Sequence, residues 1–313
     1  MHSTNRQGSQ TARTIDNRAT LSTQAGNKWA GFAGFTALML CFLAAPSQAW
    51  WGNGHGILTE AAVLAQPQEV PAFFRNAAAQ VAHMSFDPDV AKNRAAPHLY
   101  DGEFTEHFFD LELLEGDDIP EKRHEFIALC NRLGVAPNRI GYAPYSIMEY
   151  TERLMVAFAE HRKWPENPMI QAKIFVYAGI LAHYAEDIAQ PLHATIHYDG
   201  RVVDDGEKLH AGIHETMDSL IERLEMKPTD LARNVTVVPI EGDLAEAVRA
   251  QIYESNGRVD LVYELVEGLD PVSKQGRALA QERARRAVAF TASLYLTAWQ
   301  LSEDVRLPGW LKR

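Results

Sequence analysis

Imidazole and carboxylate side chains recur in this 313-residue chain at spacings that suit metal binding. His183 and Asp187 are four residues apart, so on a helix they share one face. Pro191 would end that helix, and His193 would then approach from a new direction. Zinc takes nitrogen and oxygen ligands of these kinds. The alternative is an ordinary helix end with solvated histidines, and the choice depends on what the rest of the chain offers.

Other segments offer further ligands of the same kinds. His214 and Asp218 repeat the spacing of four residues, His55 lies near Trp50, and His107 follows an acidic segment. That segment supplies either Asp87 or Asp89. Asp89 is preferred because Pro88 pre-sets the chain before it. Each zinc ion needs three or four protein ligands, so this set would suffice for three ions if one carboxylate bridges two of them. Together these pairs favour a metal centre over solvated histidines.

The elements that must position these residues are predicted to be helices. Apolar residues recur at helical spacing, and an apolar run before His183 indicates a buried helix. The pattern predicts an all-α, single-domain helical bundle of about seven to nine helices around a trinuclear zinc cleft. The expected helices span residues 59–65, 71–82, 121–133, 143–163, 168–187, 210–225, 243–269 and 272–304. Residues 83–106 are expected to be irregular, and Asn234–Ile240 is the one strand-like run.

The first 49 residues are predicted to be a secretory signal peptide. A basic stretch precedes an apolar segment, which ends in a small-residue cleavage sequence at Ala49. The remaining domain, residues 50–313, would be secreted or periplasmic, with no integral membrane span after processing. Cys130 would be its only cysteine, so it could form no intrachain disulfide. The whole chain carries a formal net charge of −11, which disfavours polyanionic partners unless bound cations make a cleft locally positive.

These motifs resemble the zinc-dependent phospholipase C superfamily, which also contains the single-strand-specific nucleases of the P-one type. The resemblance runs from Trp50 to about Asp218. It is carried by Trp50, His55, His107-Phe108-Phe109-Asp110, His183-xxx-Asp187 with Gln190-Pro191-Leu192-His193, and His214-xxx-Asp218. The central stretch with Gln-Pro-Leu-His is the most specific part.

The resemblance implies a site for each of three zinc ions. The implied ligand sets are Asp89, His107, His183 and Asp187 for the first ion, His193, His214 and Asp218 for the second, and the amine and carbonyl of Trp50 with His55 and a bridging oxygen of Asp187 for the third. Only cleavage before Trp50 would create the required α-amine, whose pKa near 8 leaves a neutral ligand accessible near neutral pH. Asp89 could also act as the general base.

The implied activity is phosphodiester hydrolysis by a secreted enzyme of the phospholipase C type, in which a metal-bound hydroxide attacks phosphorus. The substrate would be a phospholipid or another phosphodiester, and no protein partner is implied. The alternative is a single-strand-specific zinc nuclease, 3'-nucleotidase-like, acting on single-stranded nucleic acid. Asp218 and the Trp50-to-His55 spacing are nuclease-like, whereas His183-Tyr184 is phospholipase-like. A third possibility is a metal-binding protein without catalysis.

Three further residues are candidates for substrate contacts rather than for metal. Phe108 and Tyr100 could line a substrate pocket, although aromatic residues beside a site are more often part of the core. His197 follows His193 by four residues and could lie at the mouth of the cleft.

Overall fold

Helix α9 (Pro168–Ala189) carries the central motif of the chain, and the sequence explains both of its ends. The side chain of Asn167 accepts a hydrogen bond from the backbone N–H of Met169, and Pro168 occupies the first turn. Both features favour helix initiation. The helix ends at Ala189, before Gln190-Pro191, because proline cannot continue the hydrogen-bonding pattern.

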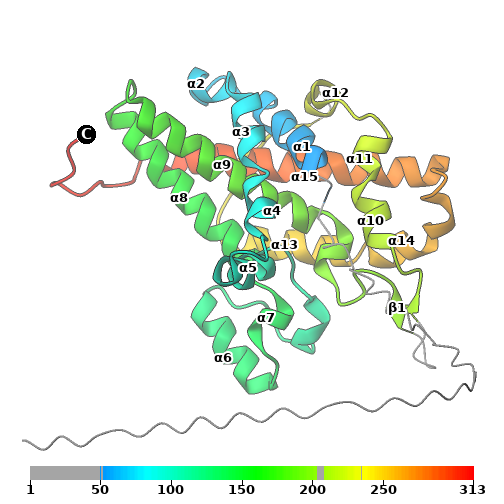
Figure 1. The fold of residues 1–313 in the computed structure, drawn as a ribbon. Coiled ribbons are helices and arrows are strands. Elements are labelled where there is room, and N and C mark those ends of the chain that lie inside the picture. Colours follow the sequence, from blue (N-terminus) through cyan, green and yellow to red (C-terminus); the bar gives the residue numbers. More distant parts are fainter. Residues whose placement is uncertain (1–49, 51, 203–207, 234) are drawn as a thin grey trace, which may run out of the picture. The chain divides into compact units, whose positions relative to one another are not determined.

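The computed structural model describes residues 50, 52–202, 208–233 and 235–313, and they form an all-α domain, as predicted (Figure 1). The expected signal peptide, residues 1–49, lies outside the described residues. The longer helices are α1 (Gly52–Leu64), α6 (Arg123–Leu133), α8 (Ala143–Lys163), α9, α13 (Leu244–Asn256) and α15 (Lys274–Leu301). Among the described helices, none combines the length and apolarity that a membrane span needs.

The remaining α-helices are short, with four to seven residues each. They are α2 (Ala72–Arg75), α3 (Ala78–Met84), α4 (Asp87–Ala91), α5 (Pro97–Glu103), α7 (Pro137–Ile140), α10 (Ile213–Asp218), α11 (Leu220–Arg223), α12 (Pro228–Arg233) and α14 (Val259–Glu264). The 3-10 segments are η1 (Phe104–Glu106), η2 (Leu111–Leu114), η3 (Pro191–Ala194) and η4 (Val266–Gly268).

The short helices explain where the expected element boundaries differ from the structure. Residues 83–106, expected to be irregular, contain α4, α5 and η1. Residues 210–225 divide into α10 and α11, and residues 243–269 divide into α13, α14 and η4. Apolar periodicity continues across such breaks, so it cannot locate them.

The strand-like run before Ile240 was wrongly predicted to be a strand. Residues 235–240 adopt no regular secondary structure in the described chain. Val235 and Val237 instead pack against the core, and the backbone N–H of Ile240 donates to Thr297 Oγ1 (2.8 Å). A strand requires a neighbouring strand for its backbone groups, and among the described residues this run has none. The described strands are β1 (Arg201–Val202) and β2 (Lys208–Leu209), an antiparallel pair.

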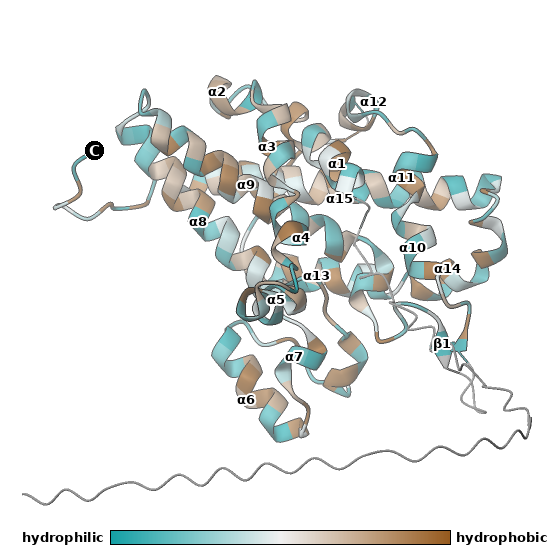
Figure 2. Ribbon diagram, viewed as in Figure 1, coloured by the Kyte–Doolittle hydropathy of each residue, from teal (hydrophilic) through white to brown (hydrophobic). Residues whose placement is uncertain are grey.

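The packing around α9 buries the C-terminal part of the helix. Helices α3, α8 and α15 contact α9, and every residue from His183 to Ala189 is buried. In Figure 2 the middle of α9 is largely apolar. The buried C-terminal part also carries the polar residues His183, Glu186 and Asp187, which must find partners there.

The contact between α3 and α9 is unusually close because α9 has a glycine there. A Cβ at Gly179 would lie 2.5 Å from Met84 Cβ and 2.7 Å from the Met84 carbonyl carbon. This approach brings the carbonyl of Ser85, the residue after α3, to 2.7 Å from His183 Nδ1. The glycine therefore contributes to positioning a candidate ligand one turn further along the helix.

Candidate metal centre

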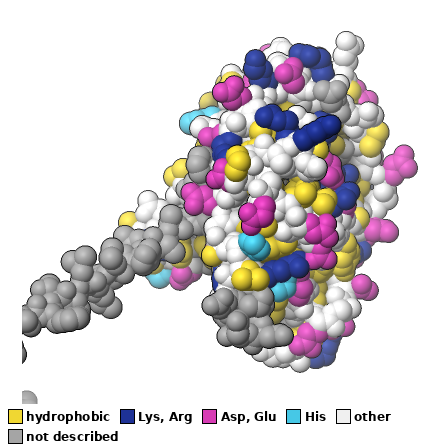
Figure 3. Space-filling model, turned by 90° about the vertical axis from the view of Figure 1, so that its right-hand side faces the viewer, with side chains coloured by type: hydrophobic (Ala, Val, Ile, Leu, Met, Phe, Trp, Pro, Cys, Tyr) yellow, Lys and Arg dark blue, Asp and Glu magenta, His cyan; other side chains and the backbone are white. Residues whose placement is uncertain are grey.

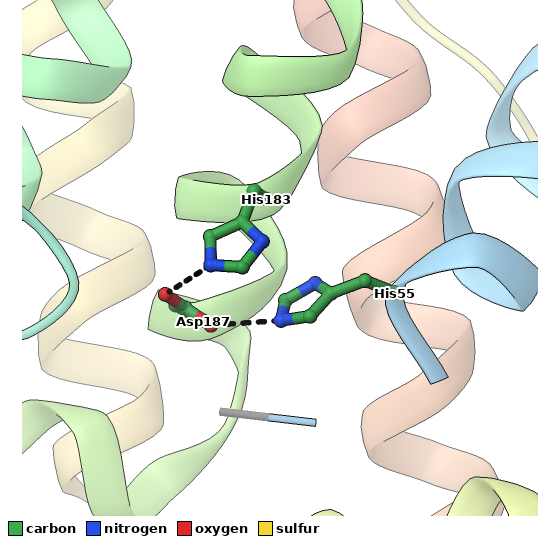
Figure 4. Close-up of side chains that lie close together, drawn as sticks. All are labelled: His55, His183 and Asp187. Atoms are coloured by element: carbon green, nitrogen blue, oxygen red, sulfur yellow. Dashed lines mark ion pairs between the residues drawn. The ribbon is translucent and has the colours of Figure 1, made fainter. Parts of the chain in front are cut away.

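The first His/Asp group joins α1 to α9 (Figure 4). His183 and Asp187 both project from α9, and His55 reaches them from α1. Asp187 Oδ1 lies 3.2 Å from His55 Nε2, and Asp187 Oδ2 lies 3.5 Å from His183 Nε2. All three side chains are fully buried, and their donor atoms are close enough together to hold one metal ion.

The second group shares His183 with the first and adds Asp89 from α4 and His107, which follows η1. His107 Nδ1 lies 3.0 Å from His183 Nε2 and 2.9 Å from Asp187 Oδ2. Asp89 Oδ1 lies 3.7 Å from His183 Nε2. Asp187 therefore contacts histidines of both groups, one with each carboxylate oxygen.

The structure distinguishes Asp89, which the sequence favoured as a ligand, from the alternative, Asp87. Asp89 belongs to the second group, whereas Asp87 is exposed and belongs to none of the His/Asp groups found among the described residues. Both lie in the first turn of α4. They are two residues apart, so they point in different directions around the helix.

The third group consists of His193 from η3 with His214 and Asp218 from α10. His214 Nε2 lies 2.9 Å from His193 Nε2 and 3.3 Å from Asp218 Oδ2. The spacing of four residues places His214 and Asp218 on one face, and the turn at Pro191 brings His193 to them. The second oxygen of Asp218 accepts a hydrogen bond from Gln190 Nε2 (2.8 Å).

Trp50 lies at the first group. Its side chain is fully buried, and its indole Nε1 donates to the backbone carbonyl of Glu186 (3.0 Å), the residue before Asp187. In the full chain the nitrogen of Trp50 is part of the peptide bond to Ala49, so the α-amine implied by the resemblance would exist only if the chain were cleaved there.

Backbone carbonyls fix the rings of two of these histidines. His183 Nδ1 lies 2.7 Å from the Ser85 carbonyl, and His193 Nδ1 lies 2.8 Å from the His107 carbonyl. A carbonyl can only accept, so in each neutral ring Nδ1 carries the proton and Nε2 presents a lone pair. Such hydrogen bonds commonly orient histidines that bind metals. His55 Nδ1 instead faces a carboxylate oxygen of Glu186, at 2.8 Å.

Several buried polar atoms of the groups have no hydrogen-bond partner among the described residues. His55 Nε2 and Asp187 Oδ1 face each other, and Asp218 Oδ2 is a third such atom. Their nearest partners stand in ion-pair contacts at 3.2 and 3.3 Å rather than in hydrogen bonds, and a buried polar atom without a hydrogen bond is costly. A cation that accepts nitrogen and oxygen donors would satisfy these atoms. The residues present therefore fit a metal such as zinc.

The pKa shifts of Asp187 and His55 also favour a bound cation. Burial raises the pKa of Asp187, but attraction to His183 and His193 and hydrogen bonds from other histidines outweigh burial and hold that pKa well below its usual range. Burial lowers the pKa of His55, but Asp187 and Glu186 outweigh it and raise the pKa to about 10. The carboxylates thus stabilise positive charge at this position, whether a proton or a metal ion carries it.

The histidines of the third group respond differently. Burial lowers the pKa of His193 and takes the pKa of His214 well below its ordinary value. Burial also raises the pKa of Asp218 well above its ordinary value. Neutral imidazoles are the form that binds zinc, so the first two shifts suit a metal site.

The candidate substrate residues lie near the groups without lining the adjacent pocket. Tyr100 on α5 stacks on Phe104 with ring centroids 5.7 Å apart, and Phe104 contacts Phe108 edge-on at 6.0 Å. His197 is partly buried, and its carbonyl accepts from the hydroxyl of Tyr263.

A pocket of about 300 Å³ lies next to His107 and is lined by a different set of residues. Within the part of the chain that the structure describes, none of Tyr100, Phe108 and His197 lines it. The lining residue nearest the groups is Glu103, whose Oε1 lies 3.4 Å from His107 Nε2 and accepts a hydrogen bond from Tyr184.

Sequence reasoning missed Glu103, Glu186 and Gln190 as neighbours of the candidate ligands. Glu186 and Gln190 flank Asp187 in the motif, but their contacts are with His55 and Asp218 in other segments. Glu103 had one available signal, because it precedes His107 by four residues, the same spacing as the recognised pairs.

The chain matches no family model, and no curated protein matches it. A function therefore has to be argued from the three His/Asp groups, their surroundings and the motif resemblance.

Proposed function

We propose that the protein is a zinc-dependent phosphodiester hydrolase of the phospholipase C type, secreted after removal of residues 1–49. One observation carries the proposal: the first two His/Asp groups share His183 and both contact Asp187, with the third group nearby in sequence at His193. Shared ligands are what closely spaced metal ions require. Bound zinc ions would supply a water of lowered pKa and neutralise charge on phosphoryl oxygens.

Asp89 is held in the ionised form that either a metal ligand or a general base requires. Burial raises its pKa, but attraction to His183 and Lys92 outweighs burial and leaves the pKa below its ordinary value. Lys92 Nζ lies 2.5 Å from Asp89 Oδ1. The carboxylate is therefore ionised at neutral pH, and its side chain is not fully buried.

The surroundings of His107 favour a substrate with a cationic group, as in a phospholipid headgroup. The adjacent pocket is lined by Glu103, Glu106 and Glu149, and by Tyr150. Carboxylates and aromatic rings together attract cations. Two arginines also line the pocket, and one of them, Arg123, is ion-paired to both Glu106 and Glu149.

Charge on the drawn face adds support for a lipid rather than a nucleic acid. In Figure 3 acidic and basic side chains are interspersed on that face, rather than gathered into a basic track. Binding a polyanion along its backbone depends on such a track.

A single-strand-specific nuclease is the second candidate, and a different observation favours it. Phe104 is 39% exposed and lies between Tyr100 and Phe108 in a row of ring contacts that ends beside His107. Exposed aromatic rings can stack on unpaired bases. In this alternative the same metal groups would act on a nucleic-acid phosphodiester.

The test is an assay of purified, zinc-loaded protein on a chromogenic phosphocholine ester and on single-stranded DNA, with bound zinc measured in parallel. Hydrolysis of the ester supports the phospholipase C type, whereas hydrolysis of DNA alone would refute it in favour of the nuclease. Inactivity on both substrates with zinc bound would indicate a metal-binding protein without catalysis. His183→Ala should abolish activity and reduce zinc content together. His161→Ala is the matched control, because His161 is also buried and lies on α8 outside all three groups.

The N-terminus gives an independent check of processing. Intact-mass measurement of the exported protein should show a chain that begins at Trp50. A start at Trp51 would remove the residue whose indole contacts Glu186 and would contradict the proposed role of Trp50.

A further inference from the structure

Glu186 is a fully buried carboxylate whose two oxygens are both bonded to α1. Oε2 lies 2.8 Å from His55 Nδ1, and Oε1 accepts from Thr59 Oγ1 at 2.9 Å. His55 and Thr59 are four residues apart, so they present one face of α1 to this side chain. Burying a carboxylate is costly unless its partners are well placed, and here both partners lie on a single helix face.

The backbone of the same residue contacts a second part of the first group. The carbonyl of Glu186 accepts the indole N–H of Trp50, while its side chain bonds to His55. Asp187 follows directly in the chain. Glu186 therefore contacts Trp50 and His55 and directly precedes Asp187, the three residues that the resemblance assigns to one ion. Its own carboxylate oxygens bond to His55 and Thr59.

We infer that Glu186 is a positioning residue, which orients His55 so that Nε2, on the side of Asp187, is the nitrogen that binds the metal ion. The carboxylate accepts the Nδ1 proton, and Nε2 lies 3.2 Å from Asp187 Oδ1. This inference rests on the proposed zinc centre. A carboxylate that accepts the Nδ1 proton also makes the imidazole a stronger metal ligand than a neutral acceptor would. His183 differs from His55 in this respect, because its Nδ1 bonds to a backbone carbonyl.

A purely structural role would be to join α1 to α9. The two roles make different predictions for a double variant. If Glu186 acts on metal binding through His55, its removal should have no further effect on zinc affinity once His55 is gone. If it only holds the helices together, the two losses should add.

The experiment measures zinc affinity by competition with a chelator for the wild type, Glu186→Ala, Glu186→Gln, His55→Ala and the double variant Glu186→Ala/His55→Ala. Glu186→Ala should weaken one zinc by about 10- to 100-fold and leave the others unchanged. Glu186→Gln should weaken the same zinc less than Glu186→Ala does, because its amide oxygen can still accept from His55 and its amide nitrogen can donate to Thr59, although the negative charge is lost. The double variant should bind zinc no more weakly than His55→Ala.

Glu160→Ala is the matched control. Glu160 is also a buried carboxylate, but it lies on α8, pairs with Lys173 and belongs to none of the three groups. Its removal should leave zinc affinity unchanged. Unchanged affinity in Glu186→Ala, or additive losses in the double variant, would overturn the inference. If the wild type bound no zinc, the proposed function itself would fail, and the two failures are thus distinguished.

A measurement on the zinc-loaded wild type remains decisive even if Glu186→Ala does not fold. Nitrogen-15 NMR of the histidine rings should show His55 protonated at Nδ1, with that proton in a strong hydrogen bond, and unprotonated at Nε2. A His55 ring that carries its proton at Nε2 would overturn the inference.

Discussion

Asp187 is the side chain on which the centre should depend most, and Asp187→Asn tests this directly. The substitution keeps the size of the side chain but replaces one oxygen by a hydrogen-bond donor. Asp187 Oδ1 faces His55, and Oδ2 faces His107 and His183. Because Oδ1 faces His55 of the first group and Oδ2 faces His107 of the second, an asparagine can retain an acceptor toward only one of these two histidines, and it loses the negative charge toward both.

The expected magnitude follows from the number of groups affected. At free zinc about 100 times above the dissociation constant, each occupied site adds about 2.7 kcal/mol to the free energy of unfolding. Three sites would add about 8 kcal/mol, and Asp187→Asn should retain about 3 kcal/mol from the third group alone. The measurement is the free energy of unfolding in denaturant, with zinc and with a chelator, for each protein.

Asp218→Asn is the matched control for this prediction. Asp218 is likewise fully buried and follows a histidine by four residues on a helix, but it contacts the third group alone. It should retain about 5 kcal/mol of the zinc-dependent stabilisation, from two sites. If zinc stabilised Asp187→Asn as much as Asp218→Asn, the reasoning that Asp187 serves two groups would be refuted.

Three further outcomes are expected. Asp89→Ala should lower zinc content and abolish hydrolysis, whereas Asp87→Ala, at an exposed residue outside the groups, should change neither. Metal analysis and the ester assay would compare the two variants, and a larger effect of Asp87→Ala would contradict the geometry. Arg283→Leu should lower the free energy of unfolding by about 3 kcal/mol in denaturant titrations, because this fully buried guanidinium donates twice to the last carbonyl of α9; a loss below about 1 kcal/mol would argue against that role. The metal-free protein should lose stability as pH rises from about 7 to 9. Burial lowers the pKa of His55, but its pairing with Asp187 and Glu186 outweighs burial and raises that pKa to about 10, so the folded chain keeps a proton that the unfolded chain has lost; denaturation in a chelator at pH values from about 7 to 9 would show no such slope if His55 were not protonated in the folded protein.

The local part of the centre could be predicted from the sequence because it depends on helical spacing. His183 with Asp187, and His214 with Asp218, are pairs whose geometry a single helix determines. The turn at Pro191 follows from the chemistry of proline. The all-α fold was predictable for a similar reason, since apolar periodicity over long segments identifies helices even when it misplaces their ends.

Contacts between segments could not be predicted from the sequence. Glu186 meets His55 across 131 residues, and Gln190 meets Asp218 across 28. Neither pair has a local pattern, because the two partners lie on different elements, so no helical or strand spacing relates them. The same applies to the strand expected before Ile240, which depended on a partner strand that the described fold does not provide.

The sequence by itself determined which residue types could bind metal and which pairs share a helix face. The tertiary structure decided that Asp89 rather than Asp87 belongs to the second group. It also brought His183 and Asp187 into contact with residues of both the first and the second group. It also revealed a buried carboxylate behind His55. The physical reason is that spacing along one helix fixes directions within that helix only. The close approach of α3 to α9 at Gly179, and the packing of α1 against α9, fix how those directions meet.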